Sequence, residues 1–362
     1  MNLEIKKIRI NELGAFWKSE AFLGLKHVPI SPARAKSYVN NPNAKPGDVA
    51  LYLGFVENEL VAYRSLFAGI AQTGGGATRF GWCSGSWVHP NFRRKGYSKI
   101  LLQEAYSDWD GKLMFTNYAP ESEKLYLSTG WFRQVHEFKG VRAYLFPKSQ
   151  KLIPLAKKYK WMKPVFGLAD ASISMVSKTR CVFFNEKIKS SFRFEELASP
   201  DKQCYQFLKN HDQKLFFNRK ENELKWIFEF PWISDENKEV ADKYQFTSVS
   251  SSFYYRAIKV FYENSFAGFF IFSVKDGHLK TLYFSQLKSF ENEIAVFLKQ
   301  YCVKNNIAMA TIYNSSLAGV LFKRKFPFLH LKNYGQKIYG SFHVGKIEEY
   351  NFQDGDGDVI FT

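Results

Sequence analysis

Apolar and polar residues follow two different periods along the first 146 residues of the chain. Alternation at every second residue and short apolar runs predict strands at residues 3–10, 49–56, 60–70, 80–88 and 112–116. Apolar residues at helical spacing predict helices near residues 11, 31, 100 and 120, with Asn11 and Ser31 as the N-caps of the first two. A closing strand is predicted around Arg142 to Phe146. The resulting order, β-α-α-β-β-β-α-β-α-β, predicts the α/β class, with a mixed sheet flanked by helices.

The second half of the chain repeats the end of this order with little residue identity. Its pattern predicts strands at residues 192–197, 253–263, 266–274, 278–285 and 307–313, and helices at 290–305 and 315–325. A repeat of this length indicates two tandem domains. We expect an N-terminal domain at residues 1–148, a basic connector at 149–180 and a C-terminal domain at 181–362.

The connector is rich in lysine. Five lysines precede its first acid, Asp170, namely Lys151, Lys157, Lys158, Lys160 and Lys163. Leu152, Leu155 and Tyr159 recur at helical spacing, so part of the connector is predicted to be an amphipathic basic helix. Such a helix either packs on one domain as a link or meets an anionic lipid or an anionic acceptor.

A short basic loop joins the predicted strand at 80–88 to the helix that follows it. The loop reads Val-His-Pro-Asn-Phe-Arg-Arg-Lys-Gly-Tyr-Ser over residues 88–98. The first N–H groups of a helix have no partner inside the helix, and Gly96 lets a phosphate approach the main chain closely. Arg93, Arg94 and Lys95 add positive charge, so the loop is either an anion site or a solvated basic turn.

The order of residues in this loop resembles motif A of the GNAT family of N-acetyltransferases, Arg/Gln-x-x-Gly-x-Gly/Ala. Here the motif is Arg93-x-x-Gly96-x-Ser98, in which Ser98 stands where Gly or Ala is usual. The resemblance implies two tandem acyl-CoA N-acyltransferase folds and an acetyl-CoA site. The implied cofactor-binding residues are Val88, Arg93, Arg94, Lys95, Gly96, Tyr97 and Ser98. Their main-chain N–H groups would hold the pyrophosphate, and the strand ending at Val88 would pair with the pantetheine arm.

A second segment resembles the same family at its usual distance downstream. Asn117 and Ala119 follow a short strand, Tyr126 lies on the next helix, and Gly130-Trp131 follows. The resemblance implies that Asn117 contacts the cofactor and that the Tyr126 hydroxyl acts as general acid to the departing CoA thiolate. On its own, a tyrosine on a helix is usually a packing residue.

Composition limits the location and the binding partners that we expect of the protein. The formal net charge is +17, and no run of about 18 apolar residues predicts a membrane span. The four cysteines, Cys83, Cys181, Cys204 and Cys302, lack metal-ligand or redox spacing, which is typical of a reduced, cytoplasmic protein without a metal. The positive charge suits CoA or an anionic acceptor, nucleic acid or an acidic lipid surface, or a plain lysine-rich surface. No nucleic-acid-binding motif accompanies it.

The second half lacks the diagnostic loop. Between its third strand and the following helix, residues 284–289 read Phe-Ser-Gln-Leu-Lys-Ser, with no glycine and no arginine pair. We therefore expect this half to shape the acceptor pocket or an interface. The chain ends with the acidic run Asp354 to Asp358, which lacks the twelfth-position Glu of an EF-hand. We expect a surface turn there, with completion of the acceptor site as the alternative.

Direct attack of an amine on the thioester is the chemistry that the resemblance implies. A backbone N–H at Val88 or its neighbour would polarise the thioester oxygen. The general base stays open: His89 adjoins a proline turn, and Glu121 and Glu123 suit the start of their helix. An amino sugar, a small amine or a polypeptide terminus would be the acceptor.

Two other functions remain open at this stage. Aminoacyl transferases that build peptidoglycan cross-bridges also pair two GNAT-like halves and use tRNA, but they usually lack an intact motif A in the first half. The other alternative is a non-catalytic protein that senses CoA or binds a partner. Sequence gives neither the acceptor nor the oligomeric state.

Overall fold

The computed structural model describes residues 2–117, 119–146, 163–211, 214–234, 242–285, 290–347 and 350–362. Within these ranges, none of the helices combines the length and apolar content that crossing a membrane requires. The chain forms two compact units. Unit 1 comprises Met1–Glu137, Leu208–Phe253 and Gln336–Thr362, and unit 2 comprises Phe138–Phe207 and Tyr254–Gly335.

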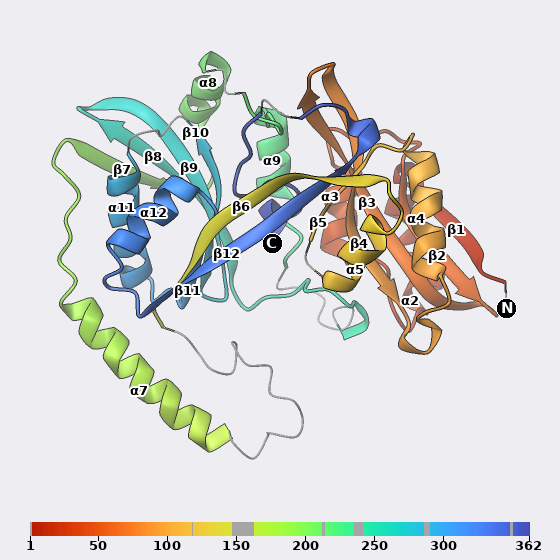
Figure 1. Cartoon of the computed structure of the whole chain (residues 1–362), viewed down its shortest axis with the longest axis horizontal. Helices are drawn as coiled ribbons and strands as arrows, with labels where there is room; N and C mark the ends of the chain where they lie inside the picture. Colours follow the sequence, from red (N-terminus) through yellow and green to blue (C-terminus); the bar gives the residue numbers. More distant parts are fainter. Residues whose placement is uncertain are drawn as a thin grey trace. The chain divides into compact units, whose positions relative to one another are not determined.

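Unit 1 contains most of the N-terminal elements (Figure 1). These are β1 (Glu4–Arg9), α1 (Ile10–Phe16), α2 (Glu20–Leu23), α3 (Pro32–Val39), β2 (Val49–Val56), β3 (Glu59–Thr73), β4 (Gly76–Val88), η1 (Pro90–Phe92), α4 (Tyr97–Asp108), β5 (Leu113–Thr116) and α5 (Pro120–Leu127). Later segments add α9 (Glu221–Glu229), η3 (Phe342–Val344) and η4 (Val359–Phe361).

Unit 2 is built mainly from the second half of the chain. Its elements are α7 (Lys163–Val182), β7 (Phe192–Leu197), β8 (Phe253–Tyr262), β9 (Ser265–Lys275), β10 (His278–Ser285), α11 (Glu291–Lys304), β11 (Met309–Ile312) and α12 (Ser315–Lys323). Three elements run across the division between the units, namely β6 (Phe132–Tyr144), α8 (Lys202–Asn210) and β12 (His330–Ser341).

Each half of the sequence lends its closing strand to the sheet of the other half. The strand order is β1-β2-β3-β4-β5-β12 in unit 1 and β7-β8-β9-β10-β11-β6 in unit 2. In unit 1, residues 338–340 of β12 pair antiparallel with residues 114–116 of β5. In unit 2, residues 141–144 of β6 pair antiparallel with residues 309–312 of β11. Each compact unit therefore holds residues from both halves of the sequence.

The repeat expected from the sequence is visible in matching hairpins. Glu57 and Asn58 join β2 to β3 with φ of 48° and 63°, and Glu263 and Asn264 join β8 to β9 with φ of 47° and 64°. Two successive positive φ values are the mark of a type I′ turn, whose twist suits a two-residue hairpin. The same dipeptide therefore makes the same turn at equivalent places in the two halves.

Helices cover the sheet of unit 1 on opposite faces. α4 packs on β2, β3 and β4, and its apolar side includes Leu101, Leu102 and Ala105. α3 lies on the opposite face, where Tyr38 packs against Phe67. In unit 2, α11 and α12 pack together and share one apolar core with β8 to β11 and the end of β6.

Of the two N-caps predicted from the sequence, one is confirmed and one is wrong. Ser31 caps α3 as expected, because its hydroxyl accepts a hydrogen bond from the N–H of Arg34 at 3.3 Å, and Pro32 is the first helical residue. The expected cap at Asn11 is wrong. α1 begins at Ile10, and the side chain of Glu12 accepts from the N–H of Arg9 at 2.8 Å.

The connector is described only from Lys163 onward, so the helix expected around Leu152 to Tyr159 lies outside the described residues. α7 itself is fixed to unit 2. The hydroxyl of Ser177 donates to the carbonyl of Leu145 at 2.5 Å, and the guanidinium of Arg180 donates to the carbonyls of Pro327 and Phe328 at 2.9 and 3.1 Å.

Gly140 is the position in unit 2 where a side chain is least tolerable. A Cβ there would lie 2.1 Å from the carbonyl oxygen of Ile312, in the strand that pairs with β6. We predict that Gly140→Ala lowers the free energy of unfolding by roughly 2 kcal/mol or more, measured by urea denaturation, because the strands must separate. Gly319→Ala is the matched control. It lies inside α12 with open space around it, so alanine should leave stability unchanged or raise it by up to about 1 kcal/mol. Equal losses in the two variants would contradict the prediction.

Candidate active site

β4 and β5 run together for only three residue pairs and then diverge. Gly81, Trp82 and Cys83 pair in parallel with residues 113–115, and β5 ends at Thr116. β4 continues to Val88 with β3 as its strand neighbour. The pairing with β3 shifts at Ser84, which is an extra residue in β4 and therefore a β-bulge. From this bulge onward, one edge of β4 has no strand partner among the described residues.

The predicted basic loop follows directly. Arg94 and Gly96 adopt positive φ of 64° and 82°, and Gly96 is the N-cap of α4. Within the described chain, the main-chain N–H groups of residues 94–98 make no hydrogen bond. The side chains of Arg93, Arg94 and Lys95 are exposed, and a Cβ at Gly96 would meet nothing within 4 Å. Free N–H groups, a helix N-terminus and three cations together are features that favour binding of an anion.

Arg64 is the residue that links this loop to Tyr126, and the sequence analysis missed it. It lies on β3 with 1% of its surface exposed. Its guanidinium donates to the Tyr126 hydroxyl, and to the carbonyl and hydroxyl of Ser98 at 3.3 and 3.4 Å. The available signal was a single arginine inside the apolar run of residues 60–68. The departure from motif A at Ser98 is therefore matched by a contact to Arg64.

Tyr126 is a buried, protonated phenol beside the divergence of the strands. Its ring stacks on Phe115 with centroids 4.0 Å apart. Burial raises the pKa of Tyr126 well above its usual value, the charge of Arg64 lowers it, and Cys83 raises it. Because the phenol oxygen accepts from Arg64, the phenol keeps its own proton to donate to another group.

The other predicted cofactor residues are less accessible to a ligand. The side-chain oxygen of Asn117 accepts from the N–H of Lys337 at 2.7 Å, and the N–H of Asn117 donates to the Lys337 carbonyl at 3.1 Å. The Asn117 carboxamide oxygen thus extends the β5–β12 ladder, which leaves its amide nitrogen for a ligand. Tyr97 is buried in the core under the sheet, so its main chain alone lies at the loop. Val88 is half-buried at the end of β4.

Three residues, His89, Glu121 and Glu123, were considered as the general base from the sequence. His89 is the N-cap of η1, and its Nδ1 accepts from the N–H of Asn91 at 3.3 Å, which agrees with a structural turn. Glu123 accepts a hydrogen bond from the Tyr339 hydroxyl. Glu121 is exposed in the first turn of α5.

The expectation of a surface turn at the acidic C-terminus is wrong. Asp354, Asp356 and Asp358 are buried, with 4%, 1% and 8% of their surfaces exposed. The Asp356 carboxylate pairs with Arg219 at 2.7 Å, and Asp358 accepts from the Ser84 hydroxyl at 2.7 Å. Gly357 permits the approach, because a Cβ there would lie 2.2 Å from the ring of Trp82. Among the described residues, no cluster of His, Cys, Asp and Glu could hold a metal ion.

The bulge at Ser84 brings two groups of polar residues to opposite faces of β4. Cys83 lies in the core beside α4 together with Tyr126. Ser84 reaches Asp358 through its hydroxyl, and its carbonyl accepts from Arg34 at 2.5 Å. The contacts of Arg34 and Asp358 with Ser84 could not be recognised from the sequence, because they join residues 50 and 274 positions apart.

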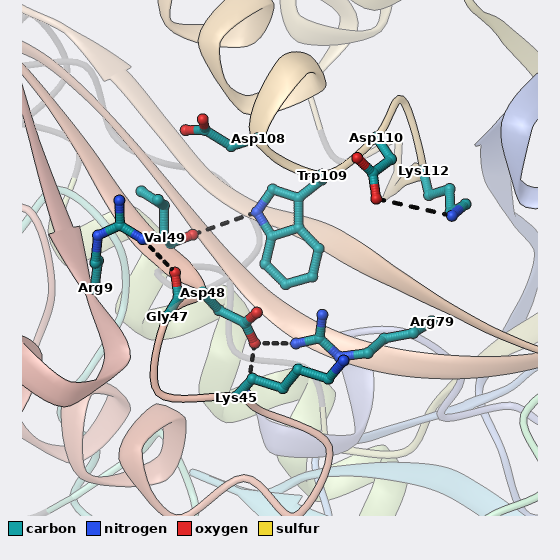
Figure 2. Close-up of a pocket in the computed structure, with 10 residues that line it drawn as sticks. All are labelled: Arg9, Lys45, Gly47, Asp48, Val49, Arg79, Asp108, Trp109, Asp110 and Lys112. Carbon is teal, nitrogen blue, oxygen red and sulfur yellow. Dashed lines mark hydrogen bonds and ion pairs between the residues drawn. The ribbon is translucent and has the colours of Figure 1, made fainter.

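A pocket of about 280 Å³ lies at the far end of β4 (Figure 2). Its lining residues are Arg9, Lys45, Gly47, Asp48, Val49, Arg79, Asp108, Trp109, Asp110 and Lys112. Figure 2 shows that Arg79 pairs with Asp48 and that Lys112 approaches Asp110. Arg79 precedes Val88 by nine strand residues, or about 30 Å at the usual rise per residue. This pocket is therefore remote from the loop, and its ion pairs hold residues 45–48 to the sheet.

No protein-family model and no curated protein sequence matches the chain. Solved structures resemble it at low identity. A tandem GNAT protein from the clavulanic acid biosynthesis pathway is 11% identical, with a TM-score of 0.48 over 94% of this chain and 98% of its own. A GCN5-related N-acetyltransferase from Anabaena variabilis is 11% identical, with a TM-score of 0.48 over 94% of this chain and 72% of its own.

The N-myristoyltransferase of Saccharomyces cerevisiae, solved with bound myristoyl-CoA, is 14% identical to this chain. It aligns with a TM-score of 0.50 over 94% of this chain and 82% of its own. At this identity the likeness concerns the fold alone. The shared fold agrees with the α/β class, a mixed sheet flanked by helices, that the sequence predicts.

Asp356 makes the stability of the C-terminal turn depend on pH. Burial raises the pKa of its carboxyl from 3.8 to about 6, although Arg219 and the N–H of Gln353 lower it. The folded state then binds this proton more tightly than the unfolded chain does. The stabilisation is complete below pH 3.8 and is lost as the pH rises through about 6.

We predict that the free energy of unfolding of the wild type, relative to Asp356→Asn, falls by about 2 kcal/mol between about pH 4.5 and about pH 7. Urea denaturation across this range measures it. Asp110→Asn is the control, because Asp110 is exposed and its pairing with Lys112 is loose at 3.9 Å. A difference that grows with pH would show that the ion pair with Arg219 keeps Asp356 ionised.

Proposed function

We propose that the protein is an N-acyltransferase that moves the acetyl group of acetyl-CoA to a primary amine at the divergence of β4 and β5. One observation carries this proposal. The free edge of β4, from Ser84 to Val88, leads straight into a loop whose N–H groups have no partner in the described chain. A ligand with a chain of amides ending in a pyrophosphate fits both features in that order.

The edge of β4 would pair with the amides of the pantetheine arm, as one strand pairs with another. The N–H groups of residues 94–98 would bind the pyrophosphate, and Arg93, Arg94 and Lys95 would neutralise its charge. The net charge of +17 favours the approach of this anion at low salt.

The transfer needs a proton for the departing thiolate. The neutral amine forms a C–N bond to the thioester carbon and the C–S bond breaks. The nitrogen loses a proton to water, and the thiolate takes the phenolic proton of Tyr126. A tyrosinate results, and the Arg64 guanidinium, already bonded to that oxygen, stabilises it. Burial keeps Tyr126 protonated until the thiolate forms, because the buried phenol has a raised pKa.

Gly96→Glu tests the cofactor site. A carboxylate there would fill the space against the loop and repel the pyrophosphate. We predict that acetyl-CoA at a hundred times its Kd stabilises the wild type by about 2.7 kcal/mol and leaves this variant unchanged. Thermal unfolding with and without acetyl-CoA measures both.

Gly76→Glu is the matched control, because Gly76 also has positive φ, 100°, and also has open space around it. It should carry the same backbone strain and keep the response to acetyl-CoA. Absence of a response in the wild type would rule out the proposal. The alternative functions, tRNA-dependent aminoacyl transfer and partner binding, would then be tested by filter binding with tRNA.

Tyr126→Phe tests the general acid. Removing one proton donor from an acyl transfer is expected to lower kcat by about 10²-fold or more while acetyl-CoA still binds. CoA release with a panel of primary amines measures kcat. Tyr52→Phe is the control, since Tyr52 is equally buried but lies on β2. Unchanged kcat in Tyr126→Phe would mean that water supplies the proton.

A further inference from the structure

A row of exposed apolar side chains runs along α7 in unit 2. Leu168, Met175 and Val182 have 73%, 72% and 81% of their surfaces exposed. Residues seven apart are about two turns apart on an α-helix, so these three side chains lie in one row on the same side of α7. Val176 and Phe183, each the next residue along the chain, widen the row and are also exposed.

A different side of α7 holds the helix to unit 2. The Ser177 hydroxyl donates to the carbonyl of Leu145, and Ser177 is fully buried. The Arg180 guanidinium donates to the carbonyls of residues 327 and 328. Figure 1 shows α7 at the outside of unit 2. The helix thus joins unit 2 by one side and leaves its apolar row uncovered by the described residues.

Large apolar side chains are seldom exposed elsewhere in the described chain. Eleven of them are exposed, and five of these lie between residues 168 and 183. A sixth, Phe322, lies near the end of α12, a few residues before the segment that Arg180 binds. Such a concentration of exposed apolar surface is typical of a site that contacts a partner or a membrane.

Positive charge surrounds this apolar row. Residues 168–190 and 315–332 hold eight lysines and arginines against two acids. One of the two acids, Glu186, is already paired with Lys299 at 2.9 Å and lies 3.6 Å from Arg324. Four exposed lysines of these two segments have no carboxylate partner among the described residues, namely Lys178, Lys187, Lys323 and Lys325. The charge that this surface complements is therefore negative.

An anionic lipid surface fits this combination better than a second copy of the chain or a nucleic acid. Two copies joined through this surface would bring their lysines together, and like charges repel. A nucleic acid would pair with the lysines, but its bases stack on aromatic rings, which Leu168, Met175 and Val182 do not offer. A bilayer accepts both features, because aliphatic side chains enter among the lipids while lysines beside them stay at the headgroups.

We propose that the exposed side of α7 binds the surface of a membrane that contains anionic lipids. Leu168, Met175 and Val182 enter among the lipids, and Lys178, beside the row, stays at the charged headgroups. A helix bound in this way lies in the plane of the interface. The inference concerns unit 2 and does not depend on the proposed function.

Co-sedimentation of the full chain with vesicles tests this proposal. Two kinds of vesicle are compared, phosphatidylcholine alone and phosphatidylcholine with about 30% phosphatidylserine. We expect the apparent affinity to be about 10-fold or more higher with phosphatidylserine at about 0.1 M salt, and to fall as salt is added, because ions screen the lysines. Equal affinity for the two kinds of vesicle, or binding to neither, would overturn the proposal.

Two pairs of variants with matched charge changes locate the surface. Met175→Glu should lower the affinity for the anionic vesicles about 10-fold or more and leave the melting temperature unchanged, because the side chain is exposed. Leu23→Glu is its control, since Leu23 is an exposed helical residue of unit 1 and should bind as the wild type does. Lys178→Gln should lower the affinity about 5-fold, whereas Lys26→Gln, at an exposed lysine of unit 1, should not.

The other possible occupants of the row give different results, each of which overturns the proposal. A second copy would make the wild type a dimer and Met175→Glu a monomer in sedimentation without vesicles. Coverage by another part of the same chain would make Met175→Glu lower the melting temperature. A nucleic acid would be retained on filters by the wild type and Met175→Glu alike and more weakly by Lys178→Gln. Vesicle binding that Met175→Glu leaves unchanged would also overturn it.

Discussion

The extra residue at Ser84 is the constraint on which the site in unit 1 depends. A strand without it would present alternate side chains to the two faces in an unbroken register. The bulge interrupts that register next to Cys83, the last residue of β4 that pairs with β5, and β4 goes on with one edge that has no strand partner among the described residues. The same residue sends its hydroxyl and its carbonyl to the face that carries Arg34 and Asp358. The end of the β4–β5 pairing and the contacts to Arg34 and Asp358 thus lie at neighbouring residues of β4.

Two buried arginines hold the elements around this part of β4. Arg64 connects β3 to the start of α4 and to α5, and Arg34 connects α3 to β4. A buried guanidinium is costly unless its hydrogen bonds are satisfied, so each arginine favours the arrangement that supplies acceptors. This requirement orders the surroundings of β4 more sharply than apolar packing alone, because apolar packing has no preferred direction.

Sequence patterns predicted the features that depend on residues close together in the sequence. The strands, most helices, the glycine-containing loop at residues 93–98 and the capping of α3 all follow from local periodicity and local chemistry. The partners of β6 and β12 do not, since an alternating strand fits either sheet equally well. The burial of Asp356 was predicted wrongly, because acidic composition indicates a surface and the offsetting partner, Arg219, lies far away in the sequence. Arg64 was the one site residue visible as an anomaly, a lone charge in an apolar strand.

The exchange of closing strands makes the folding of unit 1 depend on the second half of the chain. Without the second half, the sheet of unit 1 would lose β12 and expose the edge of β5, and the C-terminal turn against Ser84 would be lost with it. An unpaired edge strand invites aggregation, so a shortened gene would encode a poorly soluble product. The second half, whose sequence has no equivalent of the loop at residues 93–98, is thereby needed for the folding of unit 1, independently of any chemistry of its own.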